Sequence, residues 1–257
     1  EVEAALEWTL PNLVEFRDVR GDLHVHSKYS DGAATFDRIA QKAEAMGLEW
    51  VAVCDHSQSL KIAGGVSIAR MREKIEEVEK FNRSCKKVKL LCGTEVDINN
   101  DGSLDYPDEL LDRLDIVVAA IHTGFRQDER TVTNRIIKAM HHPRVHIIAH
   151  PTGRLIGERE AYPGNVDSIV GEAVKTNTAL EINAYPQRLD LNDIYCRAVK
   201  EKGVRLGIGT DAHIVDQMEY LELGLSVARR GWLEKGDLLN CLSYQELMIA
   251  LKKKWKT

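Results

Sequence analysis

The chain has 257 residues, of which 44% are hydrophobic and 29% charged, and this composition excludes a disordered or low-complexity protein. The formal net charge of −5 disfavours a nucleic-acid binder, although bound metal cations would shift this balance. No apolar run reaches the roughly 18 residues that cross a bilayer, so we expect no membrane partner.

Residues 1–20 predict an entry segment or interdomain linker in which Pro11 breaks a short helix. Short β-branched runs then alternate with amphipathic helical stretches. The predicted strands are 22–26, 50–56, 88–98, 116–122, 145–150, 179–184 and 205–211. The predicted helices between them are 35–46, 68–81, 108–114, 131–140, 166–175 and 192–202. After Asp211 only helices are predicted, over 216–229 and in two short pieces from Asp237 and Tyr244.

Strand–helix alternation of this kind predicts βαβ units and a parallel sheet. Seven strands in steady succession favour a closed β/α barrel over an open doubly wound sheet, and no G-x-G-x-x-G motif follows the first strand. We expect a single α/β domain over residues 21–257, with the barrel reaching to about residue 213 and helices after it. The C-terminal run of lysines, 252–256, is interpreted as a solvated helix end.

The cysteines follow no metal or disulfide pattern. Without any Cys-x-x-Cys pair, an odd number of cysteines indicates reduced thiols and a cytoplasmic location. The five are Cys54, Cys85, Cys92, Cys196 and Cys241.

Histidine and carboxylate side chains fall at or near the ends of the predicted strands. They recur at about the length of one βα unit, so each leaves its strand at the same end of the barrel. That end is the C-terminal rim, where barrel enzymes build their active sites. The candidates are His24, His26, His56, Glu95, His122, His150, Asp211 and His213.

Such a mixture of imidazoles and carboxylates is typical of zinc, manganese or iron sites. One ion takes about four to six ligands, so eight candidates are too many for a single ion. Asp31, in the Ser30-Asp31-Gly32 turn, gives a ninth, which is enough for three divalent ions if Glu95 bridges two. Sites with several metals are typical of phosphoryl-transfer hydrolases, in which a metal-bound water serves as the nucleophile without a separate catalytic side chain.

A lone histidine at a strand end is more often a hydrogen-bonded structural residue than a ligand. Six at one rim favour the metal interpretation, because buried imidazoles lose solvation unless they are paired. His141, His142 and His146 lie away from the rim and are interpreted as structural. Three aspartates that border the candidate ligands either orient an imidazole or are structural: Asp22, Asp55 and Asp97.

As a set, these motifs resemble the polymerase and histidinol phosphatase (PHP) superfamily. The resemblance rests on His24-Val25-His26, Ser30-Asp31-Gly32, Asp55-His56, Glu95, His122, His150-Pro151 and Asp211-Ala212-His213. It implies a distorted (β/α)₇ TIM-like barrel with three metals at the C-terminal rim. By the family pattern, the three groups of ligands are His24, His26, Glu95 and Asp211; Glu95, His122 and His150; and Asp31, His56 and His213.

Residues outside the ligands resemble the C-terminal PHP domain of bacterial and archaeal family X DNA polymerases. The blocks are Arg20–His24, Asp101–Pro107, His150–Arg154, Leu180–Ala184 and Ala228–Trp232. This resemblance implies a manganese-dependent 3′–5′ exonuclease that processes DNA 3′ ends in repair, with a polymerase domain on the same natural chain as a partner. The chain lacks the polymerase palm, fingers and helix-hairpin-helix.

Four side chains near the rim are candidates for substrate binding. Arg154 follows His150 and is expected to contact a phosphate, whereas Arg126 is equally consistent with a surface salt bridge. Asn183 ends the sixth strand, and Lys61 lies in a loop that is either a lid or a plain mobile segment. Arg188 is a weaker candidate.

The leading functional hypothesis is a metal-dependent 3′–5′ exonuclease. A second is a small-molecule phosphatase of the histidinol-phosphate type, with the same metal centre. A third is a catalytically silent PHP domain kept as an interaction module, which we rank last because no ligand position has been lost.

Overall fold

The computed structural model describes residues 1–254 and shows one sheet of seven parallel strands in sequential order. Each strand pairs with the next along the chain, from the first to the seventh. The strands are β1 (Gly21–Val25), β2 (Trp50–His56), β3 (Lys89–Asp97), β4 (Ile116–Ala120), β5 (Ile147–Ile148), β6 (Ala179–Asn183) and β7 (Leu206–Gly209). The sheet curves into a nearly closed barrel, so the predicted α/β barrel is confirmed.

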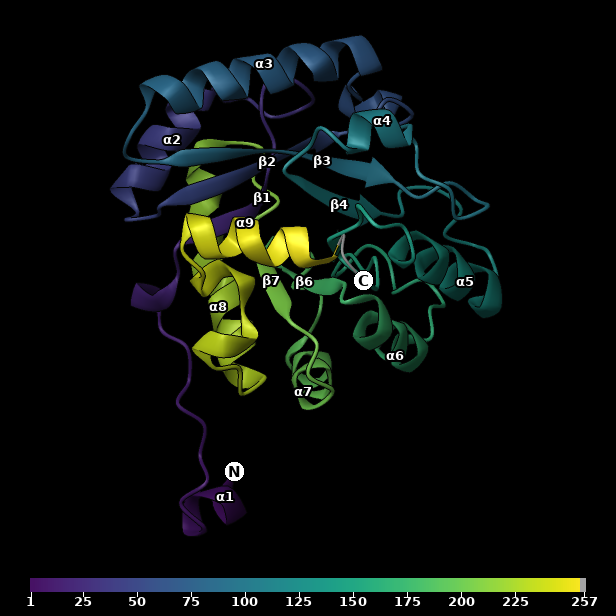
Figure 1. Ribbon diagram of the computed structural model, residues 1–257. Coiled ribbons are helices and arrows are strands. Elements are labelled where there is room, and N and C mark those ends of the chain that lie inside the picture. Colours follow the sequence, from purple (N-terminus) through teal and green to yellow (C-terminus); the bar gives the residue numbers. More distant parts are fainter. Residues whose placement is uncertain (255–257) are drawn as a thin grey trace.

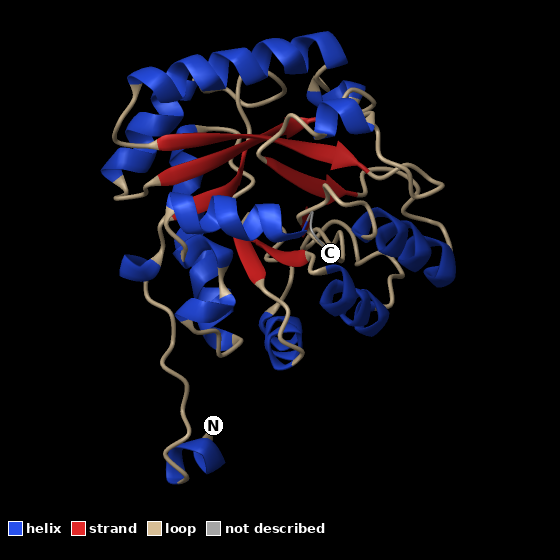
Figure 2. Cartoon of the chain, viewed as in Figure 1, coloured by secondary structure: helices blue, strands red, loops and turns tan. Residues whose placement is uncertain are grey.

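Helices surround the strands (Figure 2). Those after the strands are α2 (Phe36–Ala45), α3 (Ile68–Ser84), α4 (Asp108–Leu111), α5 (Glu129–Met140), α6 (Val166–Thr176) and α7 (Asp193–Glu201). Beyond β7 lie η3 (Val215–Tyr220), α8 (Leu221–Arg230), η4 (Lys235–Asp237), η5 (Leu239–Cys241) and α9 (Tyr244–Lys253). The remaining elements are α1 (Val2–Leu6), η1 (Phe16–Asp18) and η2 (Lys61–Ala63).

The sequence pattern explains why these elements form. The residues of β2 are all buried, as expected of a parallel strand covered on both faces. Helix α2 buries Phe36, Ile39, Ala40 and Ala43, which recur at the three- and four-residue spacing of one helical face. Side-chain oxygens cap the amino ends of five helices, from Ser67, Asp128, Asn165, Asn192 and Ser243.

The boundaries differ from the prediction where the chain leaves the barrel. Strands β4, β5 and β7 end before His122, His150 and Asp211, because the chain turns onto the rim there. The backbone of His150 and Asp211 is left-handed, with φ of 28° and 54°, which ends a strand. The helix predicted over 216–229 is divided into η3 and α8.

The ends of the chain are placed differently from one another. Helix α1 lies away from the barrel (Figure 1), and the Trp8 side chain is 94% exposed. The lysine run was predicted to be solvated, and this is correct for only part of it. Lys252 and Lys253 are exposed, whereas Lys254 is buried and donates to the Met140 carbonyl and Thr178 hydroxyl; Trp255 and Lys256 lie outside the described residues.

Among the described residues, none of the helices has the length and apolarity that crossing a bilayer requires. The five thiols form no disulfide, and four of them are buried.

The barrel closes where β1 meets β7. Near the rim, the Asp22 carboxylate accepts bonds from the Thr210 hydroxyl at 2.5 Å and from the Thr210 amide at 3.1 Å. The His26 amide donates to the Ala212 carbonyl at 2.9 Å, and Val25 forms a parallel bridge with Ala212. Asp22 therefore joins the two strands rather than orienting an imidazole ring.

At the opposite end, Asn240 of η5 fills the seam. Its side-chain oxygen accepts from the Ile208 amide at 2.6 Å, and its nitrogen donates to the carbonyls of Gly21 and Ile208, both at 2.8 Å. Asn240 is fully buried. Its side chain therefore provides hydrogen-bond partners for three buried backbone groups that β1 and β7 leave unpaired.

We predict that Asn240→Leu destabilises the protein by about 3 kcal/mol or more, because it leaves three buried backbone groups without partners at about 1–3 kcal/mol each. Urea unfolding followed by circular dichroism measures the change. The control is Gln41→Ala, at an exposed position of α2, which should shift stability by less than about 0.5 kcal/mol. A loss below about 1 kcal/mol for Asn240→Leu would contradict the role of this seam.

Candidate metal centre

The nine candidate ligands gather at the carboxyl end of the barrel. His24 lies in β1, His56 ends β2 and Glu95 lies in β3, whereas His122, His150 and Asp211 follow β4, β5 and β7. Parallel strands present their carboxyl ends at one rim, so residues far apart in sequence become neighbours. His26, Asp31 and His213 complete the set from the segments after β1 and β7.

Glu95 is the hub of this cluster. Its side chain is 1% exposed, and both of its carboxylate oxygens face imidazole nitrogens. Oε1 lies 2.8 Å from His150 Nε2 and 3.2 Å from His122 Nε2. Oε2 lies 2.9 Å from His56 Nδ1, 3.5 Å from His24 Nε2 and 3.8 Å from His26 Nε2. One carboxylate thus lies within 4 Å of five imidazoles.

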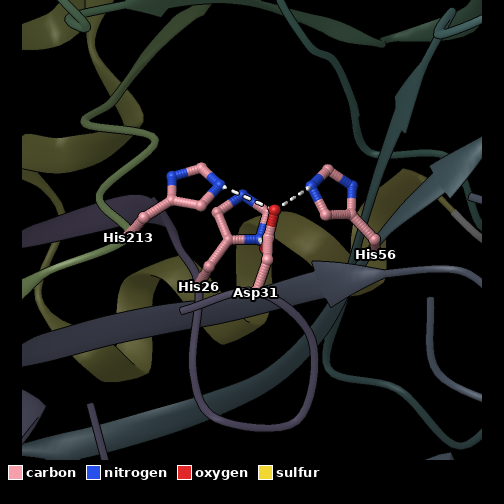
Figure 3. Close-up of side chains that lie close together, drawn as sticks. All are labelled: His26, Asp31, His56 and His213. Atoms are coloured by element: carbon pink, nitrogen blue, oxygen red, sulfur yellow. Dashed lines mark ion pairs between the residues drawn. The ribbon is translucent and has the colours of Figure 1, made fainter. Parts of the chain in front are cut away.

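Asp31 is the centre of a second group, in which its carboxylate faces three imidazoles (Figure 3). Its Oδ2 lies 3.2 Å from His213 Nε2 and 3.6 Å from His56 Nε2, and its Oδ1 lies 3.7 Å from His26 Nδ1. The His26 ring stacks with those of His213 and His56, with centroids 4.3 and 4.5 Å apart. Asp211 completes the rim, with Oδ1 3.0 Å from His26 Nε2.

The carboxylates of the centre are held in the ionised form that metals bind. Burial alone would raise the pKa of Glu95, but the neighbouring imidazoles of His122, His56 and His24 hold it well below its usual value. Burial likewise opposes ionisation of Asp211, and its hydrogen bond with His26 helps hold its pKa well below the usual value.

The imidazoles are pushed in opposite directions. Burial, followed by the charge of His56, lowers the pKa of His26 to about 4. For His122, burial is outweighed by Glu95 and Asp97, which raise its pKa to about 10. So many coupled rings cannot all carry protons at once, whereas cations bound between them would take over the neutralisation of the carboxylates.

Several buried polar atoms of the cluster make no hydrogen bond, which is costly unless something else binds them. They are His24 Nε2, His26 Nδ1, His56 Nδ1, His150 Nδ1 and Glu95 Oε2, of which His56 Nδ1 and Glu95 Oε2 lie 2.9 Å apart without the angles of a hydrogen bond. All but His150 Nδ1 belong to residues whose ligand atoms converge in groups within 4.8 Å of one another. Nitrogen and oxygen donors in this arrangement fit zinc, manganese or iron.

The convergent groups overlap the ligand sets implied by the family pattern but divide the residues differently. They are His26, Asp31, His56 and His213; His24, His26 and Asp211; and His56, Glu95 and His122. His26 and His56 each appear in two groups, and His150 reaches the centre through Glu95 instead. How the ligands are divided among the ions is therefore a proposal.

The backbone at two candidate ligands also indicates a functional site. His150 and Asp211 are non-glycine residues with positive φ, a conformation that costs about 1–3 kcal/mol and is concentrated at active sites.

A second layer of carboxylates orients the imidazoles. Asp97 Oδ1 lies 2.9 Å from His122 Nδ1, and Glu181 Oε1 lies 2.7 Å from His24 Nδ1. Each ring therefore donates its Nδ1 proton outward and directs Nε2 toward Glu95. Glu181 also accepts the His150 amide at 2.6 Å, so it supports two of the six histidines.

Glu181 was not among the residues that the sequence singled out as functional. The sequence did contain one indication of its role. Glu181 lies two residues before Asn183 in an apolar strand, and this spacing puts both side chains on one face. Asn183 is buried, and its side-chain nitrogen lies 3.2 Å from both Glu181 Oε2 and Asp211 Oδ2.

Asp55 supports the loop that carries Asp31. It accepts hydrogen bonds from the backbone and hydroxyl groups of Ser27 and Ser30 at 2.8–3.2 Å. Lys74 neutralises it, with Nζ 2.6 Å from Asp55 Oδ2, and both side chains are fully buried. This pair fixes the loop rather than an imidazole.

The three histidines interpreted as structural lie outside the cluster. His146 Nδ1 accepts from the Val117 amide at 2.9 Å, and His141 and His142 pair with Glu172 and Asp108.

The candidate substrate residues differ in how they are held. Arg154 donates to the carbonyls of Arg188 (2.7 Å) and Leu189. Arg126 is exposed in the loop after His122, and Lys61 is exposed at the start of η2, after His56.

Arg188, a weaker candidate from the sequence, lies next to one of the ligands. Its Nε is 3.4 Å from Asp211 Oδ2, and its Nη1 is buried without a hydrogen bond. Only 16% of the Arg188 side chain is exposed. A buried guanidinium nitrogen without a partner suits an anionic ligand at the centre.

Comparisons with known proteins agree with this geometry. The PHP domain model matches residues 22–190. The chain is 41% identical over 241 residues to the DNA polymerase/3′–5′ exonuclease PolX of Bacillus subtilis. This match covers 94% of the chain but only 42% of that relative's length. It is 32% identical over 208 residues to a probable phosphatase of Syntrophotalea carbinolica, covering 77% of the chain and 81% of the relative.

Among solved structures, the chain is similar in fold to a histidinol phosphate phosphatase from Lactococcus lactis, complexed with zinc, L-histidinol and phosphate. The TM-score is 0.58 at 15% identity, covering 82% of the chain and 93% of that structure.

We predict that Mn²⁺ or Zn²⁺ stabilises the chelator-treated protein. At a free metal concentration of 100 times Kd the gain is about 2.7 kcal/mol, and the melting temperature rises by roughly 5–10 °C. Differential scanning fluorimetry measures the shift. Glu95→Gln should lose most of it, whereas Glu76→Gln, on the exposed face of α3, should keep it. An unchanged melting temperature in the unsubstituted protein would refute the metal assignment.

Proposed function

The chain belongs to the PHP domain family, and on that premise we propose that it is a metal-dependent phosphoesterase that hydrolyses DNA from the 3′ end. One observation carries the proposal: the identity of 41% with the Bacillus exonuclease extends over 94% of the chain. The coarser activity, hydrolysis of a phosphate ester, is what the names of the two kinds of relative have in common.

Divalent ions bound at this rim would neutralise phosphoryl oxygens and supply an activated water. We assign their binding to nine residues: His24, His26, Asp31, His56, Glu95, His122, His150, Asp211 and His213. Glu95 joins the two sides of the cluster, and Asp97 and Glu181 fix the tautomers of His122 and His24. No further side chain is assigned as a general base.

Arg188 is the side chain best placed to hold the phosphate. Its buried Nη1 and its nearness to Asp211 bring a fixed positive charge to the edge of the ligand cluster. A guanidinium binds two phosphate oxygens at once, so it positions the scissile phosphate against the centre. Arg154 supports this role, because it donates to the backbone carbonyl of Arg188.

A small-molecule phosphatase is the second candidate. It is favoured by the Syntrophotalea relative, of which the chain covers 81%, compared with 42% of the Bacillus relative. An interaction module without catalysis is the third, and the retention of nine ligand side chains at the rim argues against it. We also propose a polymerase region as a partner on the natural chain, because the Bacillus relative extends well beyond the matched part.

With Mn²⁺, we expect the purified chain to shorten single-stranded DNA from its 3′ end. Denaturing gel electrophoresis of a 5′-labelled oligonucleotide shows the products as a ladder that shortens with time. His56→Ala and Glu95→Ala should lower the rate by at least about 100-fold, because each removes a ligand whose donor atoms face the centre. Circular dichroism checks that the two variants remain folded.

Phosphate release from histidinol phosphate without any DNA cleavage would select the phosphatase instead. Full activity in both ligand variants would refute the assignment of the site.

We predict that Arg188→Ala lowers kcat/KM for DNA by roughly 100-fold, since it removes a charge-assisted donor near the reacting phosphate. Arg188→Lys should recover only part of the loss, because an ammonium cannot bind two oxygens in the same fork geometry. Arg72→Ala, on the exposed face of α3, serves as the matched control. Steady-state kinetics decide, and a change below about threefold for Arg188→Ala would rule out the proposed contact.

A further inference from the structure

A groove of about 610 Å³ lies between the loops that follow β4 and β5. We call it the side groove and define it by Phe125, Arg126, Arg159 and Tyr162. Phe125 is three residues beyond His122. The Tyr162 hydroxyl donates to the Pro151 carbonyl at 2.7 Å, directly after His150. The two loops that line the side groove therefore also carry two of the candidate ligands, His122 and His150.

The side groove offers a flat, rigid surface. The rings of Phe125 and Tyr162 are nearly parallel, with an interplanar angle of 13° and centroids 6.3 Å apart. The guanidinium carbon of Arg159 lies 4.0 Å from the Phe125 ring centroid, a cation–π contact. Tyr162 is held by its hydroxyl and by packing against Gly153, where a Cβ would lie 2.2 Å from the Tyr162 ring. Planar groups of this kind stack with nucleobases.

The side groove is lined by two arginines and one acidic side chain, so its charge is net positive. Arg159 Nε and Nη2 donate to the carbonyl of Gly153 at 3.2 and 2.8 Å, and a neutral acceptor leaves the positive charge in place. Burial, followed by the charge of Arg188, lowers the pKa of Arg159. Arg126 is exposed, and Glu160 is the one acidic residue among the described residues that line the groove.

We propose that the side groove binds a nucleotide of single-stranded DNA next to the scissile phosphate, with its base stacked on Phe125 and Arg159 and its phosphate facing Arg126. The occupant follows from the chemistry of the groove. Stacking needs the open face of an unpaired base, and the arginines need an anionic backbone. The volume lies within the roughly 300–1,000 Å³ typical of sites for small ligands. This inference rests on the proposed function, because it assigns the substrate class of the same centre.

Two labelled 12-mers separate stacking from charge: oligothymidylate, and an abasic oligomer of the same length that lacks bases. Both carry phosphorothioate linkages to resist hydrolysis, and fluorescence anisotropy in Mn²⁺ measures their binding. Phe125→Ala should weaken binding of oligothymidylate roughly tenfold and leave the abasic oligomer unchanged. Arg126→Gln should weaken binding of both. Phe125→Trp should retain binding, and Arg72→Gln, on α3, is the matched charge control.

Equal binding of oligothymidylate by the unsubstituted protein and Phe125→Ala would overturn the side groove as a nucleotide site, and so would an unsubstituted protein that binds neither oligomer. Cleavage of ordinary oligothymidylate is measured in parallel. If the expected binding differences appear without cleavage, the DNA-end hydrolysis fails and the groove stands. If cleavage proceeds with the same KM in Phe125→Ala, the hydrolysis stands and the groove fails.

Discussion

The arrangement depends on one buried carboxylate that lies within 4 Å of five imidazoles. Glu95 is almost inaccessible to solvent, and an ionised carboxylate in such surroundings needs positive charge or hydrogen bonds in return. The imidazoles around it repel one another when protonated, and some of their nitrogens make no hydrogen bond. Divalent cations placed between Glu95 and the rings resolve both conflicts, which is why we interpret the rim as a metal centre.

The rest of the fold keeps these groups in place. The seam between β1 and β7 joins the strands that carry or precede His24 and Asp211, and Asn240 and Asp22 satisfy the backbone there. The buried pair of Lys74 and Asp55 fixes the loop that carries Asp31. Stability and ligand geometry are therefore coupled, because a loosened seam would also separate the ligands on its two sides.

The sequence predicts the parts of this structure that follow from spacing. Recurrence of histidines and carboxylates at the length of a βα unit places them at one rim, and the seven strands lie close to their predicted positions. It does not predict contacts that depend on tertiary packing. From the sequence, Glu181 looks like an ordinary strand residue. Its role follows only from its hydrogen bonds with the His24 ring and the His150 amide. Arg188 gains its importance only because the fold brings its Nε to 3.4 Å from Asp211 Oδ2.

Anomalous diffraction from crystals grown with excess Mn²⁺ tests the central claim most directly. We expect three anomalous peaks at the rim, at least one of them within about 2.0–2.3 Å of a Glu95 oxygen and of imidazole nitrogens. Saturating manganese with no anomalous peak within coordination distance of Glu95 would contradict the interpretation of this cluster as a metal centre.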